Sequence, residues 1–233
     1  MTRRAARDPE TRETRRTRKR ARILTVARGL LRQHGHERLS LRGVARQAGV
    51  SPAGMYEFFH ARDDLVATLA GEASARLSRG LRTSTQDTTE PVERLVQLGL
   101  AYIRFAKRHP ADFMLLYGRL SRRRSLAEDV PAESEYGQIR SAVAEIIGAR
   151  GVRAADPRFL EALAYGFWSV IHGMAMLQLT HLSGFRADFA SAHRLVLGSI
   201  AASWRRMDWE EILAPHAEAP GPKPTIRTRG KIR

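Results

Sequence analysis

The feature that most constrains this chain is the segment AGVSP at residues 48–52, which lies between two short apolar runs. Gly49 can take the positive φ that commonly ends a helix. Ser51 is a preferred N-cap residue, and Pro52 fits the first helical position because its missing N–H would have no partner there. The segment therefore predicts that one short helix ends and another begins within four residues, as in a helix-turn-helix.

Apolar residues recur at helical spacing on both sides of this turn, and no convincing alternating strand is present. The pattern predicts helices over residues 20–34, 40–48, 52–59 and 62–81. Gly35 is a suitable stop for the first helix and Ser40 a suitable N-cap for the second. Asp63 and Asp64 suit the positive end of the fourth helix dipole. In such a unit the exposed helix after the turn is the one that enters the major groove of DNA.

Positive charge is concentrated at the two ends of the chain, which carries a net charge of +16 over 233 residues. Residues 1–22 hold ten Arg and Lys against three acids, and residues 214–233 hold five against one. Both ends are poor in apolar residues, so we expect them to be disordered. Such tails either contact a polyanion, more often nucleic acid than an anionic membrane, or only improve solubility.

Several classes of protein are excluded or disfavoured by what the sequence lacks. With no cysteine, the chain has no disulfide, thiolate zinc site or cysteine nucleophile. No apolar secretory segment follows Met1, so we expect a cytoplasmic protein. The eight histidines show no metal-ligand pairing at i, i+4, and the nucleophile-elbow, phosphate-loop and dinucleotide motifs are absent. We therefore expect no metal, no cofactor and no enzymatic activity.

The second half of the chain predicts a further set of helices. Their expected ranges are 91–109, 110–117, 133–149, 157–185 and 187–207. Residues 162–185 form the longest apolar segment and have no formally charged side chain, so their length would suit a membrane span. Because the segment also contains His172, Gln178 and His181, a buried helix beginning at Pro157 is the more economical interpretation, and we expect no membrane.

Small residues are dense on the last two expected helices, for example Gly173, Ala192 and Gly198. Small side chains let a second helix approach closely, and an isologous two-fold is the commonest way to use such a surface. These helices therefore predict a homodimer.

Residues 20–69 resemble the N-terminal DNA-binding domain of the tetracycline-repressor-like (TetR-like) family. The resemblance rests on RILTVARGLLRQHGHERLSLRGVARQAGVSPAGMYEFFHARDDL, in which the helix starts, the Ala-Gly-Val-Ser turn and the Tyr-x2-Phe close fall in family order. It implies that the DNA-binding residues are Ser40, Arg42, Ser51, Pro52, Ala53, Gly54, Tyr56 and Arg62. Of these, the resemblance assigns Tyr56 and Arg62 to phosphate contacts.

Three residues depart from the usual family pattern, namely Gly54, Glu57 and Phe58. Phe58 cannot donate to a phosphate, and Glu57 repels one unless it accepts from cytosine N4. We therefore expect this helix to make few direct contacts to bases. The Arg-rich N-terminal arm would compensate electrostatically, and entry of that arm into the minor groove is a further option.

The C-terminal half is similar to a subclass of the same family with a Trp-x3-His-Gly (WHG) signature, matched by Trp168, His172 and Gly173. The resemblance implies dimerisation and an internal pocket for a small-molecule effector. Candidate lining residues are Tyr102, Phe105, Phe113, Met114, Tyr117, Trp168, His172 and Met176. Core packing would explain most of them equally well, and a buried histidine is more often a satisfied core residue than a ligand.

Together these observations predict an all-α chain: a three-helix helix-turn-helix domain followed by a helical bundle. The expected parts are a disordered basic arm (1–19), the DNA-binding domain (20–66), a ligand-binding and dimerisation domain (67–213) and a disordered basic tail (214–233). The predicted function is a ligand-responsive transcriptional repressor that binds a palindromic double-stranded DNA operator. The alternative is a non-specific nucleoid-type DNA-binding protein, which would lack the operator preference of about 10³ or more that a specific regulator shows.

Overall fold

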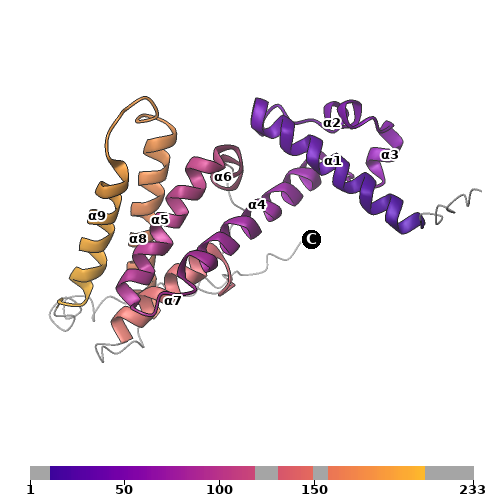
Figure 1. Cartoon of the computed structure of the whole chain (residues 1–233). Coiled ribbons are helices and arrows are strands. Elements are labelled where there is room, and N and C mark those ends of the chain that lie inside the picture. The colour runs from indigo at the N-terminus through magenta and orange to yellow at the C-terminus, as the bar shows by residue number, and fades with distance from the viewer. Residues whose placement is uncertain (1–10, 119–130, 149–156, 208–233) are drawn as a thin grey trace, which may run out of the picture.

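The computed structural model describes residues 11–118, 131–148 and 157–207, and within these ranges the secondary structure is entirely α-helical. The helices are α1 (Arg12–His34), α2 (Leu41–Ala48), α3 (Pro52–Tyr56), α4 (Arg62–Thr85), α5 (Pro91–Arg108), α6 (Pro110–Tyr117), α7 (Glu135–Gly148), α8 (Pro157–Leu179) and α9 (Phe189–Trp204). Helices α1–α3 form one end of the molecule, and α4 runs from them into a bundle of the remaining helices (Figure 1). The all-α prediction is confirmed.

Two hydrophobic cores are joined by α4. Leu65 and Leu69 of α4 belong to the core of the α1–α3 unit, whereas Leu77 and Leu81 belong to the core of the bundle. The domain boundary expected at residue 66 therefore falls inside a continuous helix. Leu115 of α6 also packs into the first core, so the two units are in contact at a second place.

Helix α5 lies at the centre of the bundle, in contact with α4, α7, α8 and α9. Gly99 permits this close packing, because a Cβ at this position would lie 2.8 Å from Leu197 Cδ1 of α9 and 3.1 Å from Ile171 Cγ2 of α8. Two apolar stripes on α5, one through Leu95 and Ile103 and the other through Leu98 and Phe105, are therefore both buried.

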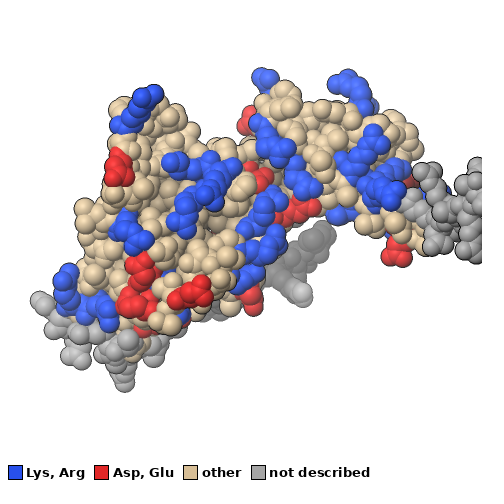
Figure 2. All heavy atoms as spheres, in the orientation of Figure 1, with Lys and Arg blue, Asp and Glu red and all other residues tan. Residues whose placement is uncertain are grey.

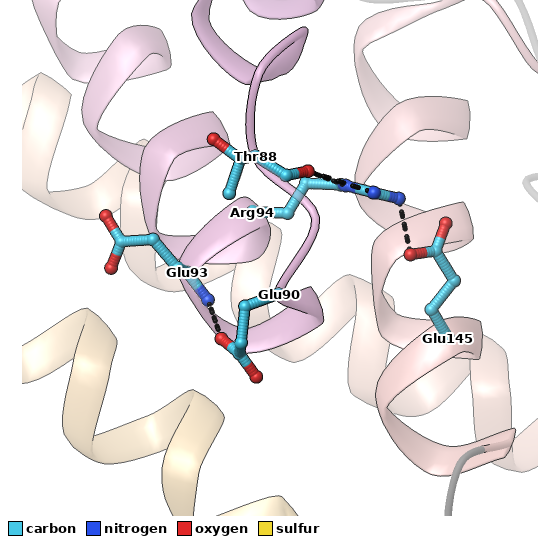
Figure 3. Close-up of polar contacts among 5 residues, drawn as sticks. All are labelled: Thr88, Glu90, Glu93, Arg94 and Glu145. Carbon is cyan, nitrogen blue, oxygen red and sulfur yellow. Dashed lines mark hydrogen bonds and ion pairs between the residues drawn. The ribbon is translucent and has the colours of Figure 1, made fainter.

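The turn between α4 and α5 is fixed by charged side chains (Figure 3). Glu90 caps α5 by accepting from the backbone N–H of Glu93 at 2.6 Å. Arg94 donates to the carbonyl oxygen of Thr88 through Nε and Nη2, at 3.2 and 3.0 Å, and its Nη1 reaches Glu145 of α7. One guanidinium thus ties the turn to two helices, and α5 starts in a defined direction.

Helix α1 begins eight residues earlier than the sequence pattern predicted. Its N-cap is Thr11, whose side chain accepts from the N–H of Thr14 at 3.2 Å, and Glu13 adds a negative charge to the first turn. Residues 12–19, expected to be part of a disordered arm, are therefore helical. The rest of that arm, residues 1–10, and the expected tail at 214–233 lie outside the described residues.

Helix α8 contains the one stretch of the described residues that is long and apolar enough to cross a membrane by length and composition, Phe159–Leu179. It packs against α5 and α7 in the bundle, with Phe167, Ile171 and Ala175 buried. Tyr165 and Leu177 remain exposed on its other side. The helix is thus part of the bundle and carries an apolar face that this single chain leaves uncovered.

Candidate nucleic-acid interface and ligand core

The helix-turn-helix is built by the caps that the sequence predicted. The Ser40 side chain accepts from the N–H of Gly43, and the Ser51 side chain accepts from the N–H of Gly54, both at 3.1 Å. Gly49 ends α2 in the left-handed region, with φ 62° and ψ 42°. Because each boundary residue satisfies a local backbone requirement, the turn between α2 and α3 has one geometry.

The start of α3 faces solvent. Ser51, Pro52 and Ala53 are exposed, and Tyr56 at the end of the helix keeps 49% of its surface accessible. Met55, on the opposite face, is buried in the core of the α1–α3 unit. The exposed face carries a hydroxyl, a methyl group and a phenol, which are suited to base-edge, thymine-methyl and phosphate contacts respectively.

Gly54 departs from the expectation that it faces DNA, because it is buried beneath α1. A Cβ at this position would lie 2.7 Å from Lys19 Nζ, 3.1 Å from Ser51 Oγ and 3.2 Å from Val50 Cγ1. The glycine therefore gives room for the lysine to cross α3. This is a correction to the predicted set of base-contacting residues.

Arg42 and Arg62 are both basic, but the structure uses them differently. Arg42 is exposed on the first turn of α2 and makes no hydrogen bond or ion pair within the described residues. Arg62 donates from Nε to the carbonyl oxygen of Leu39 at 2.8 Å and from Nη2 to that of His36 at 2.6 Å. Its remaining Nη1 lies 3.6 Å from Asp63 Oδ1. Two of the three Arg62 guanidinium nitrogens thus hold the α1–α2 connection against α4.

The extension of α1 supplies a basic surface beside α3, which sequence reasoning placed in a disordered arm. Lys19 Nζ lies 3.4 Å from Glu57 Oε2 and 5.5 Å from the centre of the Phe58 ring, and the Arg16 guanidinium is 5.8 Å from that ring. Two of the three residues that depart from the family pattern, Glu57 and Phe58, therefore contact side chains of α1. Figure 2 shows Lys and Arg side chains spread over the α1–α3 end of the molecule. The Thr11 cap with Glu13 was the sequence signal for this extension.

Five of the eight candidate pocket residues meet in the bundle. They are Tyr102, Phe113, Tyr117, Trp168 and His172. Neighbouring rings in this group have centres 4.8–6.4 Å apart, and Tyr102 Oη is 3.0 Å from His172 Nδ1. Within the described residues, the buried Nε1 of Trp168 makes no hydrogen bond. We refer to these five residues as the aromatic core.

A carboxylate that the sequence analysis did not select completes this core. Tyr117 Oη donates to Glu135 Oε1 at 3.3 Å, and the Ser74 hydroxyl donates to Glu135 Oε2 at 3.3 Å. Glu135 stands in the first turn of α7, a common place for an acid, so its sequence position gave no sign of the tyrosine partner. The core therefore has one charged acceptor at its edge.

Burial sets the protonation states of the aromatic core. It raises the pKa of the Tyr102 and Tyr117 phenols and lowers the pKa of the His172 imidazole. At neutral pH all three groups are therefore uncharged. They can offer hydrogen bonds to a ligand without the cost of burying a charge.

The other three candidate pocket residues do not join the aromatic core. Phe105 packs against the ring of His109, with ring centres 5.0 Å apart. Met114 is on the outer side of α6, 36% exposed, and lines a cleft at the junction of the two units. Met176 is half-buried against the bundle core. The part of the chain that the structure describes contains no group of three or more His, Asp or Glu that could hold a metal ion.

Two family models match the chain. The family described as "Bacterial regulatory proteins, tetR family" matches residues 23–69, and the family described as "Tetracyclin repressor-like, C-terminal domain" matches residues 95–199. The second description does not name the Trp-x3-His-Gly subclass, so that subclass stays a prediction.

Two curated relatives are similar over part of the chain. The HTH-type transcriptional regulators Rv1816 of Mycobacterium tuberculosis and Mb1846 of Mycobacterium bovis are each 30% identical over 100 residues, which are 42% of this chain and 43% of theirs. The chain thus matches less than half the length of these relatives.

Solved structures are similar in fold over about four fifths of this chain. A protein of unknown function from Rhodococcus sp. RHA1 has a TM-score of 0.61 at 23% identity, covering 81% of this chain and 94% of that one. A TetR variant from Acinetobacter baumannii AYE, in complex with minocycline, has a TM-score of 0.55 at 17% identity, covering 80% and 96%. At these identities the likeness is one of fold.

Proposed function

The chain belongs to the tetracycline-repressor-like family of bacterial transcriptional regulators, and we propose that it is a ligand-responsive repressor that binds a palindromic operator as a homodimer. The observation that carries the proposal is the exposed start of α3, set by the Ser51 cap and flanked by the basic surface of α1. As a regulator of transcription, the protein would act in the cytoplasm.

DNA recognition is assigned to three kinds of contact. Ser51, Pro52 and Ala53 would meet base edges and thymine methyl groups in the major groove. Tyr56 and Arg42 would contact phosphates on either side of the groove, with Ser40 close to the backbone. The basic surface of α1 would add contacts to DNA phosphates, which contribute to affinity whatever the DNA sequence. Arg62 would act mainly by holding the α1–α2 connection, with the N–H groups of Nη1 and the second N–H of Nη2 left to approach a phosphate.

Dimerisation is assigned to α8 and α9. Tyr165 and Leu177 on α8, and Leu195 and Val196 on α9, are apolar residues exposed in the single chain, Leu195 to 71%. A Cβ added at Gly166 or Gly173 of α8 would meet no atom within 4 Å, so a second helix has room to approach there. We expect Leu195→Arg to give a monomer in sedimentation, while Arg186→Ala, a change at an exposed residue outside α9, leaves the dimer intact.

The effector site is assigned to the aromatic core. It offers ring faces, the Tyr102–His172 pair and the unpartnered Trp168 N–H, which suit a partly aromatic ligand with one or two acceptors. The minocycline complex of the Acinetobacter baumannii TetR variant supports a small molecule of this kind. Half-sites about 34–36 Å apart fit one spacing of the two α3 helices. A ligand that binds better to a dimer with a different spacing would shift the population towards that dimer and release the operator.

The experiment is a titration of a duplex selected from a random pool against a scrambled duplex at physiological salt. We expect wild type to prefer the selected duplex by a factor of about 10³ or more. Tyr56→Phe and Arg42→Ala should each weaken binding by on the order of 1 kcal/mol, because each removes a phosphate contact. Equal affinity for both duplexes with a steep salt dependence would instead favour a non-specific nucleoid-type protein.

A further inference from the structure

A cleft lies between the two units, away from the aromatic core. It has a volume of about 600 Å³ and is walled by the end of α1 and the turn after it, by the α5–α6 connection and by the end of α8. Leu31 and His36 come from the DNA-binding unit, whereas Pro110, Met114 and Leu179 come from the bundle. A molecule in this junction cleft would therefore touch both units at once.

The wall of the junction cleft is apolar with a basic rim. Leu31, Pro110 and Leu179 give the apolar part, and Arg32 and Arg108 are exposed cations. Within the described residues neither guanidinium forms an ion pair or a hydrogen bond with a protein group. These two arginines beside an apolar wall leave positive charge available to an anion, and a guanidinium can bind a carboxylate with two parallel hydrogen bonds.

The one acid in the wall does not neutralise this rim. Asp112 is largely buried, with 14% of its side chain exposed, and its Oδ2 accepts from Arg76 Nη2 at 2.8 Å. Because Arg76 already compensates that carboxylate, the positive charge of Arg32 and Arg108 stays available to a ligand.

We propose that the junction cleft binds a small amphipathic carboxylate, a monoanion with an apolar body. The apolar body would lie against Leu31, Pro110 and Leu179, and the carboxylate would be held at the rim by Arg32 and Arg108. A volume of 600 Å³ lies within the range of sites that bind drug-sized molecules. The site is separate from the aromatic core, so the chain would have two places for small molecules.

Occupancy of the cleft would change how the two units are held together. The cleft residue His36 is in the turn after α1, and its carbonyl oxygen is fixed by Arg62 at the start of α4. A carboxylate bridging Arg32 of α1 and Arg108 of α5 would add a second tie between α1 and the bundle. The effect of that tie on operator affinity rests on the proposed function, whereas binding of the carboxylate does not.

The test is isothermal titration calorimetry of the full chain, without DNA, using three probes with one apolar body: 4-phenylbutyrate, 4-phenylbutanol and 4-phenylbutylamine. We expect the carboxylate to bind and the alcohol and amine to bind about tenfold more weakly or worse. Arg32→Gln and Arg108→Gln should each weaken binding of 4-phenylbutyrate about tenfold. Arg104→Gln is the matched control, one turn earlier on α5, exposed and outside the cleft wall.

A second variant tests the apolar part of the site. Met114 is exposed and lines the cleft, so the fold should tolerate Met114→Trp. The larger side chain should fill the cleft and weaken binding of the carboxylate. The proposal is overturned by no heat with 4-phenylbutyrate, by equal binding of the three probes, or by binding that Arg32→Gln and Arg108→Gln leave unchanged. Because no DNA is present, these results are independent of whether the chain recognises an operator.

Discussion

Replacing Arg62 with alanine is expected to destabilise the DNA-binding unit directly. In the structure Arg62 Nε and Nη2 donate to the carbonyl oxygens of Leu39 and His36, at 2.8 and 2.6 Å. These carbonyls belong to the connection between α1 and α2, whereas Arg62 begins α4. Arg62→Ala therefore cuts the polar link between the two ends of the helix-turn-helix unit.

The size of the effect follows from these two bonds. A hydrogen bond from a charged donor contributes about 1.5–3 kcal/mol, and more where the acceptor is left without a partner. The Arg62 side chain is 38% exposed, so water replaces part of what is lost. We expect a loss of about 2 kcal/mol in the free energy of unfolding, which lowers the Tm of a chain of this length by roughly 4–8 °C.

The assay is thermal unfolding of wild type, Arg62→Ala and Arg42→Ala, paired with operator titration. Arg42 is exposed and makes no hydrogen bond or ion pair within the described residues, so Arg42→Ala should change stability by less than about 0.5 kcal/mol. It should nevertheless weaken operator binding and reduce the salt slope by about 1. If Arg62→Ala has the same Tm as wild type and loses only operator affinity, the structural role is refuted and a phosphate contact is favoured.

Two further predictions concern the bundle. Gly99→Ala places a Cβ 2.8 Å from Leu197 Cδ1, and the overpacking should cost about 1–3 kcal/mol, more than the helix-propensity gain of about 1 kcal/mol. Denaturant unfolding should therefore show a lower free energy of unfolding for Gly99→Ala. Gly80→Ala is the control: its added Cβ meets open space, so its free energy of unfolding should rise. Burial lowers the pKa of His172 and of His193, so below about pH 6.5 the unfolded chain binds more protons than the folded chain, and the stability of the fold should decrease. His172→Gln should make the melting temperature less dependent on pH. A melting temperature with the same pH dependence as wild type would contradict this.

Features that depend on neighbouring residues were predictable from sequence. The Ser40 and Ser51 caps and the positive φ of Gly49 each satisfy a requirement within three or four positions, so their residue types were sufficient. Proline marked the first helical position of α3, α5 and α6 for the same reason. The helix order and the exposed start of α3 followed from these local signals.

Features that depend on distant partners were not predictable. The nearest distant neighbour of the buried Gly54 is Lys19, which is 35 positions earlier on an extension of α1 expected to be disordered. Arg62 bonds carbonyls that lie 23 and 26 positions before it. Carbonyl oxygens are common to all residues, so no residue type marked that contact.

The candidate pocket was predicted in part for a related reason. The family resemblance grouped Phe113, Met114 and Tyr117 of the short helix α6 as pocket candidates, but the structure divides the faces of α6 between two units. Phe113 and Tyr117 join the aromatic core, whereas Met114 faces the junction cleft. Which face of α6 meets which unit is set by the direction of α4 and α5, and single-sequence periodicity does not contain that information.

Operator recognition by a dimer is tested most sharply by selection of bound sequences from a pool of random duplexes by the purified protein. We expect an inverted repeat whose half-sites are centred about 10–10.5 base pairs apart or a multiple of that distance, because two α3 helices related by a two-fold axis would read successive turns of the major groove. Substitution of Ala53 on the exposed face of α3 should change the preferred bases and keep the spacing. Recovery of no enriched sequence would contradict the account, as would a motif that Ala53 variants leave unaltered.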